Sequence, residues 1–206
     1  MSDPDRRSGR RVAVLDYGMG NLRSVAKALE AAGGEAVVTA DTAEVLQCDA
    51  LCVPGQGIFG RCMANLASAG QDDLVRRWID DDRPYLGICL GLQILFDSSD
   101  EKRGEGAAIK GLSILEGQVR RLTGAVRVPH MGWSEVGGEY FYFDHSYAVH
   151  PGDESLVAGW CTHGDRFAAA VRRGWLTAVQ FHPEKSGRAG IALLTEWLGT
   201  TQETRA

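Results

Sequence analysis

The sequence predicts an α/β protein built on an open, mixed and mostly parallel sheet that is flanked by helices. Through the N-terminal half, short apolar segments alternate with segments of helical spacing, which is typical of a parallel sheet covered on both faces. After residue 110, short alternating segments separated by turn residues indicate antiparallel strands. A chain of 206 residues fits one domain, whose core is large enough to need no disulfide or metal for stability.

The first elements follow from apolar runs and from helix signals. Residues 11–16 (RVAVLD) are a short β-branched run that predicts a buried strand. Asn21 is a suitable cap for a helix over 22–33, where apolar residues recur at helical spacing until a glycine pair ends it. Residues 35–40 predict the second strand, and residues 50–57 predict a third that stops at Pro-Gly.

The later elements alternate in the same way and then change character. Helical spacing predicts a helix within 65–82, and the run 85–89 (YLGIC) predicts a strand with a helix over 91–96 directly behind it. A last helix over 190–198 is expected to pack back on the sheet. The segments expected to hold antiparallel strands are 111–122, 138–150, 155–161, 167–174 and 175–183.

Charge and composition exclude several classes of function. The net charge of −5 argues against a nucleic-acid-binding protein, for which a basic stripe is expected. The polar head carries four arginines and two aspartates, so it holds +2 and leaves −7 for the rest of the chain. We expect residues 1–10 to be a polar tail, 11–199 to be the domain, and 200–206 to be a second flexible tail.

The cysteines and apolar runs place the protein in a reducing, aqueous compartment. Five cysteines form an odd set without a spacing pattern, and the first eleven residues contain no apolar core of a secretory signal. Reduced thiols in the cytoplasm are therefore expected. The longest apolar run, 85–96, is shorter than the ~20 residues that a membrane-spanning helix needs, so no membrane association is expected.

No cofactor and no metal ion are expected. Cys161 and His163 lack nearby partners at ligand spacing, and a structural zinc ion would need a closed set of four ligands. His145 and His150 are five residues apart, which places them on opposite faces of one expected strand. The glycines of the segment GMGN do not complete a dinucleotide-binding fingerprint.

The segment Gly87-Ile-Cys89-Leu-Gly91 lies where a strand is expected to run directly into a helix. Glycines two residues to either side allow such a sharp turn to bring strand and helix close together, and this is the logic of a nucleophile elbow with cysteine in place of serine. A helix N-terminus beside the sulfur favours the thiolate. The alternative is a small buried cysteine at a glycine-rich strand end, and the pattern alone does not decide between them.

A cysteine nucleophile requires a base, and His182 in the segment VQFHPEK is the best of five histidines. It ends a β-rich run, and Glu184 follows two residues later. In extended backbone these two side chains point the same way, so Glu184 can orient the imidazole while the second ring nitrogen faces a thiol. Taken alone, the tripeptide favours the alternative, a surface histidine beside a solvated glutamate.

A third segment, Val53-Pro-Gly-Gln-Gly57, also ends an expected strand. Backbone N–H groups of Gln56 and Gly57 there, and that of Leu90 after the cysteine, could stabilise an oxyanion. The alternative for this segment is a plain β-turn. All three segments end strands of one expected sheet, and ligand sites in such sheets lie beyond the carboxyl ends of the strands.

The order PGxG, LGICLGxQ and FHPE resembles the class I, triad-type glutamine amidotransferases, which have a Rossmann-like fold. Further segments resemble the glutaminase subunits of imidazole glycerol phosphate synthases. They are Asp16–Ser24 (DYGMGNLRS), Val128–Trp133 (VPHMGW), His145–Tyr147 (HSY) and His182–Ser186 (HPEKS). Three residues depart from that pattern: Gln56 replaces a small apolar residue, Ser134 replaces asparagine, and Asp144 replaces an apolar residue.

The resemblance implies a role for each matching residue. Cys89 would be the nucleophile, His182 the base and then the acid, and Glu184 the group that orients it. The expected oxyanion donors are Gln56, Gly57 and Leu90. Substrate glutamine would lie against Gly55, Gly57, Gln93, His145, Ser146 and Tyr147. Trp133 and Lys185 would lie near an interface with a partner protein.

The resemblance also implies a reaction and a partner. The reaction is hydrolysis of L-glutamine to glutamate and ammonia through a cysteinyl thioester. The partner is a cyclase subunit that folds as a (β/α)8 barrel and forms a heterodimer with the glutaminase. It uses the ammonia to make imidazole glycerol phosphate and aminoimidazole carboxamide ribonucleotide in histidine biosynthesis. Two alternatives are a glutaminase of another pathway, such as anthranilate, aminodeoxychorismate or pyridoxal phosphate synthesis, and a regulatory protein with an inactive or redox-sensing thiol.

Overall fold

The computed structural model describes residues 9–101 and 107–200. Its strands are β1 (Arg11–Leu15), β2 (Glu35–Thr39), β3 (Ala50–Gly55), β4 (Tyr85–Cys89), β5 (Ser98–Ser99), β6 (Ile109–Lys110), β7 (Gly117–Arg121), β8 (His130–Val136), β9 (Glu139–His145), β10 (Tyr147–Pro151), β11 (Val157–His163), β12 (Asp165–Arg173) and β13 (Leu176–Val179). The main sheet has the order β2-β1-β3-β4-β13-β12-β10-β7-β5-β6, with β11 paired to β12, while β8 and β9 form a separate hairpin.

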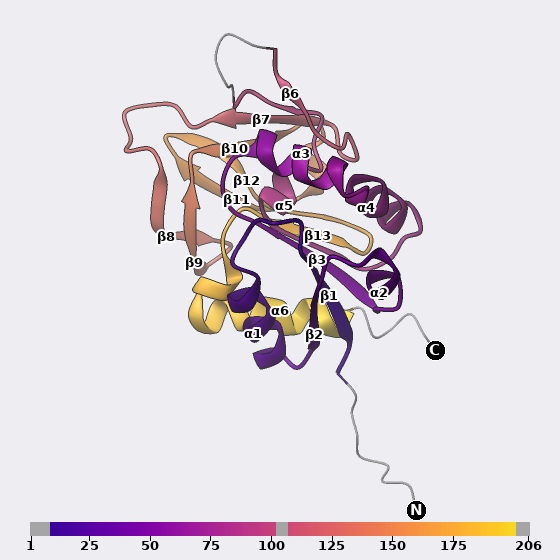
Figure 1. Cartoon of the computed structure of the whole chain (residues 1–206). Coiled ribbons are helices and arrows are strands. Elements are labelled where there is room, and N and C mark those ends of the chain that lie inside the picture. The colour runs from indigo at the N-terminus through magenta and orange to yellow at the C-terminus, as the bar shows by residue number, and fades with distance from the viewer. Residues whose placement is uncertain (1–8, 102–106, 201–206) are drawn as a thin grey trace, which may run out of the picture.

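Helices cover both faces of this sheet (Figure 1). They are α1 (Leu22–Ala31), α2 (Thr42–Leu46), α3 (Phe59–Ser68), α4 (Gln71–Asp80), α5 (Leu90–Gln93) and α6 (Gly187–Thr200), with 3-10 turns η1 (Glu154–Leu156) and η2 (Pro183–Lys185). Two buried apolar clusters lie on the two faces: α2, α3 and α4 contribute to one, and α1 and α6 to the other. The predicted fold class, an α/β protein with a mixed sheet between helices, is confirmed.

The parallel part of the sheet positions the three segments singled out in the sequence. Strands β2, β1, β3, β4 and β13 run parallel to one another, and β13 is antiparallel to β12 on its other side. Gly55 at the end of β3 pairs in register with Cys89 at the end of β4, and Val179 of β13 pairs with Ile88. Because parallel strands share a carboxyl edge, the PGQG, elbow and FHPE segments meet there, as expected.

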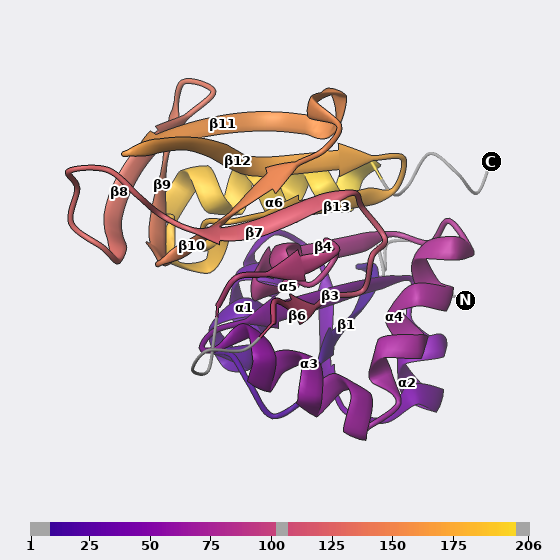
Figure 2. The same cartoon turned by 90° about the horizontal axis from the view of Figure 1, so that it is seen from above.

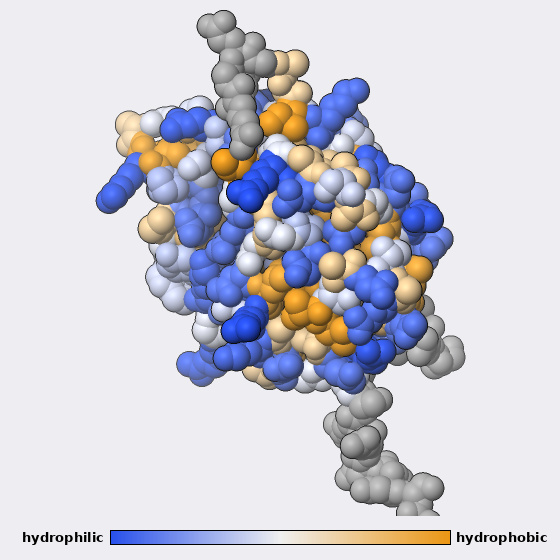
Figure 3. Space-filling model, in the orientation of Figure 1, coloured by the Kyte–Doolittle hydropathy of each residue, from blue (hydrophilic) through white to orange (hydrophobic). Residues whose placement is uncertain are grey.

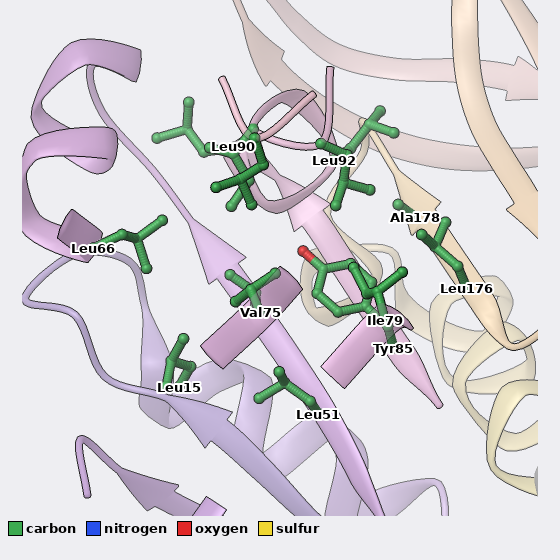
Figure 4. Packing of buried hydrophobic residues seen from close by; sticks show 14 of the residues in the cluster. Leu15, Leu51, Leu66, Val75, Ile79, Tyr85, Leu90, Leu92, Leu176 and Ala178 are labelled. Atoms are coloured by element: carbon green, nitrogen blue, oxygen red, sulfur yellow. The ribbon is translucent and has the colours of Figure 1, made fainter. Parts of the chain in front are cut away.

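The core beneath the elbow is tightly packed. Every residue of β3 and β4 is buried, which explains why their sequences are nearly continuous apolar runs rather than alternating ones. Figure 4 shows Tyr85 among Val75, Ile79 and Leu92. The phenol of Tyr85 donates a hydrogen bond of 2.8 Å to the carbonyl of Gly91, so the one polar atom of this buried side chain supports the turn after Cys89.

Three of the predicted helices are wrong in extent. The helix expected within 65–82 is two helices, because Gly70 takes the left-handed conformation (φ +65°) between α3 and α4. The helix expected over 91–96 is the single turn α5, after which the carbonyl of Leu95 accepts hydrogen bonds from the amides of Ile114 and Leu115. The last helix begins earlier than expected, at Gly187.

In the C-terminal half, one segment that was expected to form a single strand forms two. The run 138–150 is two strands, β9 and β10, interrupted at Ser146. His145 and His150 therefore lie on different strands, and their expected placement on opposite faces of one strand is wrong. Strand β8 and helix α2 were not predicted, although Asp41 followed by Glu44 is a capping pattern and the Asp41 carboxylate accepts a hydrogen bond from the Ala43 amide.

One face of the molecule is mainly hydrophilic. In the orientation of Figure 1, Figure 3 shows a mainly hydrophilic face on which hydrophobic residues lie in scattered groups. Within residues 9–101 and 107–200, no helix has the length and apolar character needed to cross a membrane.

Candidate active site

The elbow at Cys89 depends on its two glycines. Cys89 has φ +55° and ψ −103°, a strained backbone conformation for a residue other than glycine. A Cβ atom added to Gly87 would lie 2.3 Å from the carbonyl oxygen of Gly91, and one added to Gly91 would lie 1.9 Å from that of Val53. The chain can turn from β4 into α5 only because both positions lack a side chain. The strain aims the cysteine out of the strand end, as in other nucleophile elbows.

His182 and Glu184 are paired and almost completely buried. The Nδ1 atom of His182 lies 2.8 Å from Oε1 of Glu184, and the two side chains are 1% and 2% exposed. The link between them is the 3-10 turn η2 and not the extended backbone that the sequence predicted, because Pro183 begins a turn. The backbone N–H of His182 donates to the carbonyl of Tyr142 at 2.9 Å, which ties η2 to the hairpin.

Opposing influences set the charge of His182. Burial is the largest of them and lowers the pKa of the imidazole, but interactions with Cys89 and Glu184 together raise that pKa to about 9. The ring is therefore protonated at neutral pH. Its second nitrogen, Nε2, and the Oε2 atom of Glu184 are buried and make no hydrogen bond within the described residues, which leaves the Nε2 position available to a reacting group.

Cys89 opens onto a polar cavity of about 430 Å³. Its walls contain most of the residues that the sequence predicted and three that it did not, Glu101, Pro129 and Asp144. The predicted residues that line it are Gln56, Gly57, Cys89, Leu90, Gln93, His145, Ser146 and Tyr147. Gly55, which was predicted to contact substrate, is not among them.

Gly55 lies beneath the cavity and allows close packing. A Cβ atom at this position would lie 2.4 Å from the phenol oxygen of Tyr17 and 2.5 Å from Cβ of Leu90. Gly57 in the same loop has φ +115°, a conformation that favours glycine, and it faces the cavity together with Gln56. The PGQG segment thus brings backbone close to Cys89, while the larger Gln56 side chain adds a polar group to the cavity wall.

Two carboxylates give the cavity a negative wall. Burial is the main cause of a raised pKa at Glu101, although the amide of Phe59 donates to its carboxylate and acts in the opposite direction. Asp144 lies 3.8 Å from Nζ of Lys185, so its charge is partly balanced. In the part of the chain that is described, Glu101 has no such cationic partner, and it is the residue better suited to an ammonium group of a ligand.

A buried glutamine that the sequence analysis did not identify contacts the cysteine. Nε2 of Gln180 donates to Sγ of Cys89 at 3.5 Å, and Oε1 of Gln180 accepts from Gln93 at 3.0 Å. The signal was present in the sequence, because Gln180 is a polar residue in an apolar strand segment and stands two positions before His182. In an extended segment, residues at that spacing face the same way.

The hairpin β8–β9 presents an exposed apolar face near the cavity. Trp133 is 56% exposed and packs edge-on against Tyr142, with ring centroids 6.1 Å apart. Nζ of Lys185 lies 5.6 Å from the centre of the same tyrosine ring. The two residues predicted to lie near a partner are thus gathered around one side chain. Met131 and Tyr140 of the same hairpin are 62% and 57% exposed.

Metal-ligating side chains do not cluster within the described ranges. No group of three or more His, Cys, Asp or Glu residues there is arranged to hold a metal ion. The chemistry available at the cavity is that of a cysteine, a protonated imidazole, backbone amides and carboxylates.

Comparison with known proteins agrees with this geometry. Residues 13–198 match the family "Glutamine amidotransferase class-I". The imidazole glycerol phosphate synthase subunit HisH of Moorella thermoacetica is 43% identical over 90% of this chain and 92% of its own length, and that of Aquifex aeolicus is 44% identical over 89% and 94%.

Solved structures share the fold at lower identity. A structure described as a glutamine amidotransferase has a TM-score of 0.72 and 24% identity, covering 91% of this chain and 98% of its own. A structure of PurLQS from Thermotoga maritima has a TM-score of 0.64 and 17% identity, covering 94% of this chain and 97% of its own. By its family match and by the identity to its relatives, the chain belongs to the class-I glutamine amidotransferases and, within them, to the HisH subunits of imidazole glycerol phosphate synthase.

Proposed function

We propose that this protein hydrolyses L-glutamine at Cys89 and delivers the ammonia to a cyclase subunit that makes imidazole glycerol phosphate and aminoimidazole carboxamide ribonucleotide. The observation that carries the proposal is that three segments meet at one edge of the sheet: the PGQG loop and the elbow line one cavity, and the buried His182–Glu184 pair interacts with Cys89 without lining it. The strained elbow places Cys89 at a cavity of about 430 Å³, and the His182–Glu184 pair is close enough for the cysteine to raise the pKa of the imidazole. A glutamine side chain bound there would present its amide carbon to the sulfur.

The first half of the reaction forms a thioester. The Sγ thiolate of Cys89 attacks the side-chain amide carbon of glutamine, so a C–S bond forms and the carbonyl oxygen takes up negative charge. Backbone N–H groups of the loop at Gln56 and Gly57 and of Leu90 donate to that oxygen, and these residues all line the cavity. Protonated His182 then gives its Nε2 proton to the departing nitrogen, the C–N bond breaks, and ammonia leaves.

The second half releases glutamate. His182, now neutral, accepts a proton from a water molecule, and the water oxygen attacks the thioester carbon. The C–S bond breaks and returns the thiolate of Cys89 with a protonated imidazole, which is the starting state. Glu184 holds Nδ1 through both steps, so the same ring nitrogen, Nε2, serves as acid and as base.

Substrate recognition requires groups for both charged ends of glutamine. Glu101 is the acceptor we assign to the α-ammonium group because its carboxylate lines the cavity without a cationic partner in the described chain. The loop of His145, Ser146 and Tyr147 forms the opposite wall, with Gln93 between it and Cys89. We assign these residues to the remaining polar atoms of the substrate.

The cyclase partner docks, in this proposal, on the exposed face of the hairpin β8–β9. A surface with Met131, Trp133 and Tyr140 exposed has the aromatic and methionine content of an interface centre, and Lys185 lies at its margin, as in a polar rim. It also lies next to Asp144, which lines the cavity, so ammonia released at Cys89 would have a short path to a cyclase bound there. The five cysteines are all free, which fits a reducing cytoplasm.

The decisive experiment separates the glutaminase from the synthase. In a complex with the cyclase, Cys89→Ala should abolish synthesis from glutamine and leave synthesis from added ammonium salts intact, because the ammonia acceptor site belongs to the partner. Both reactions are followed by formation of imidazole glycerol phosphate. Loss of both activities, or glutamine-dependent synthesis by the variant, would overturn the proposal.

A further inference from the structure

A buried network of hydrogen bonds meets at one backbone carbonyl, that of Tyr147. Nδ1 of His145 lies 2.9 Å from this oxygen, and Nε2 of Gln93 donates to it at 2.9 Å. A carbonyl oxygen can only accept, so both neighbours must donate. That requirement fixes the tautomer of His145, with its proton on Nδ1, and the orientation of the Gln93 amide. Two branches then lead away from Tyr147.

The first branch leads to the nucleophile. The Nε2 group of Gln93 has a second proton, which it donates to Oε1 of Gln180 at 3.0 Å. Accepting at Oε1 leaves the Nε2 group of Gln180 as a donor, and it faces Sγ of Cys89 at 3.5 Å. Gln93 and Gln180 are 3% and 0% exposed, so bulk water does not replace these contacts. Within the described chain, the side-chain amide of Gln180 makes no hydrogen bond to the backbone, although most side-chain hydrogen bonds are made to the backbone or to water.

The second branch leads to the hairpin β8–β9. Since Nδ1 of His145 donates, its Nε2 must accept, and His130 donates to it from Nδ1 at 3.0 Å. Nε2 of His130 then accepts from the hydroxyl of Ser134 at 2.8 Å. His163 stacks on His130 with ring centroids 4.1 Å apart and holds the ring in place. This branch therefore runs in one direction, from the Ser134 hydroxyl to the Tyr147 carbonyl, where it meets the hydrogen bond that Gln93 donates to the same oxygen.

Both histidines must be neutral for this arrangement, and their surroundings make them so. Burial, followed by the neighbouring His163, lowers the pKa of His130 to about 4. Burial also lowers the pKa of His145 to about 3, with further lowering from His130, His163 and His182. A proton added to Nε2 of His145 would face the Nδ1–H donor of His130, and a proton added to Nε2 of His130 would reverse its hydrogen bond with the Ser134 hydroxyl.

We infer that Gln180 is a further catalytic residue, which donates a hydrogen bond to the Cys89 thiolate, and that the hairpin β8–β9 fixes its orientation through His130, His145 and Gln93. This inference deepens the proposed function and rests on Cys89 being the nucleophile. An N–H donor aimed at an anionic sulfur favours the thiolate over the thiol. The same donor limits the rotation of the side chain, so that the sulfur faces the cavity.

The first test measures the cysteine itself. Gln180→Met keeps the length of the side chain and removes the N–H donor, and iodoacetamide labelling at pH 7 is followed by mass spectrometry of the peptide that contains Cys89. We expect labelling at least about tenfold slower than in the unchanged protein, because a hydrogen bond to a charged group is lost. At pH 10 the difference should disappear, since the thiol then ionises without help. Equal rates at pH 7 would overturn the inference.

A matched control is available in Gln71, which is 1% exposed and donates to the carbonyls of Asp16 and Ala40. Gln71→Met removes an equally buried amide that does not contact the site, and Cys89 should label at the unchanged rate. If Gln180→Met does not fold, as judged by circular dichroism, Gln180→Glu keeps the acceptor for Gln93 and places a carboxyl oxygen against the sulfur. That variant should be slowed at least as strongly, and labelling at the original rate would overturn the inference.

A second test concerns the branch to the hairpin. His130→Phe keeps a ring between Phe143 and His163 and removes the donor to His145. We expect slower labelling of Cys89 in the otherwise unchanged protein and no additional slowing in Gln180→Met, because the effect must pass through Gln180. Equal slowing in both backgrounds would disprove the coupling. Failure of the proposed function is a distinct result, namely glutamine hydrolysis by Cys89→Ala.

Discussion

The imidazole of His182 links the proposed catalysis to the stability of the fold through its proton. Its pKa in the folded protein, about 9, is above the ordinary value of 6.5, so folding favours the protonated ring. The resulting stabilisation is fully present below pH 6.5 and is lost as the pH rises through 9. We expect the free energy of unfolding, from urea titrations at pH 6 and pH 10, to fall more in the unchanged protein than in His182→Gln. An equal decrease in the free energy of unfolding for both proteins would contradict a raised pKa of His182.

The pKa values of His130 and His145 are shifted in the opposite direction to that of His182. Their pKa values in the folded state, about 4 and about 3, lie below 6.5, so folding favours the neutral rings. Their contribution to stability is fully present above pH 6.5 and is lost as the pH falls toward 3. Urea titrations at pH 7 and pH 4.5 should show a larger loss in the unchanged protein than in His130→Phe. If His130→Phe lost as much stability as the unchanged protein between pH 7 and pH 4.5, a lowered pKa of His130 would be ruled out.

The sequence identified residues by motif and missed those whose roles depend on tertiary contacts. Cys89, His182 and Glu184 stand in short segments with glycines, a proline and a fixed spacing, and these constrain the backbone locally. Glu101 reaches the cavity from a loop without periodicity, so its distance from Cys89 could not be read from spacing. Gln180 had a local signal, its position two residues before His182, but its partner Gln93 is 87 residues away.

At the scale of elements, the junction between β4 and α5 is the most constrained part of the fold. Gly91→Ala should destabilise the protein by at least about 2 kcal/mol, because the new Cβ would overlap the carbonyl of Val53. Gly199→Ala in α6 is the control: it has no neighbour within 4 Å, and its effect should stay within about 1 kcal/mol. Thermal and urea unfolding measure both. Similar effects for the two variants would disprove the close-packing argument.

The elements predicted best are those in which apolar residues recur at a regular spacing and a capping or turn residue marks the end. Helix α1 begins after Asn21, whose side chain accepts a hydrogen bond from the amide of Ser24. The capping residue and the helical spacing of the apolar residues were both visible in the sequence. The helix expected within 65–82 failed because its apolar spacing continues through Gly70, where the backbone is left-handed. Strand β8 escaped prediction because its pattern is inverted. Polar residues such as His130 and Ser134 face inward, while the apolar Met131 and Trp133 are exposed.

At the scale of the whole molecule, the hairpin and the helices α2 and α4 lie at opposite ends, as Figure 2 shows. This allows a test of the proposed docking surface. Trp133→Ala should raise the Kd for the cyclase by about tenfold or more, because aromatic residues at interface centres dominate binding. Leu46→Ala, at an exposed leucine of α2, should leave the Kd unchanged. Binding is measured by calorimetry, and equal Kd values for the two variants would refute the surface.

The overall architecture was predictable in class but not in strand order. Alternating strands and helices predicted the parallel part, and turn-rich segments predicted the antiparallel part. The insertion of β13 between β4 and β12 could not be predicted, since it depends on which edges remain unpaired once the N-terminal strands have formed. That insertion is what places His182 beside Cys89.

The position of β13 also has a consequence during protein synthesis. A ribosome that has made the chain only to the end of β12 has already produced the elbow, but β4 then lacks its β13 neighbour and Cys89 lacks His182, the base that we propose for it. Such a nascent or truncated chain holds a thiol that cannot complete the release of ammonia. The fold thereby makes glutamine breakdown conditional on an almost complete polypeptide, and fragments left by premature termination would not waste the cell's glutamine.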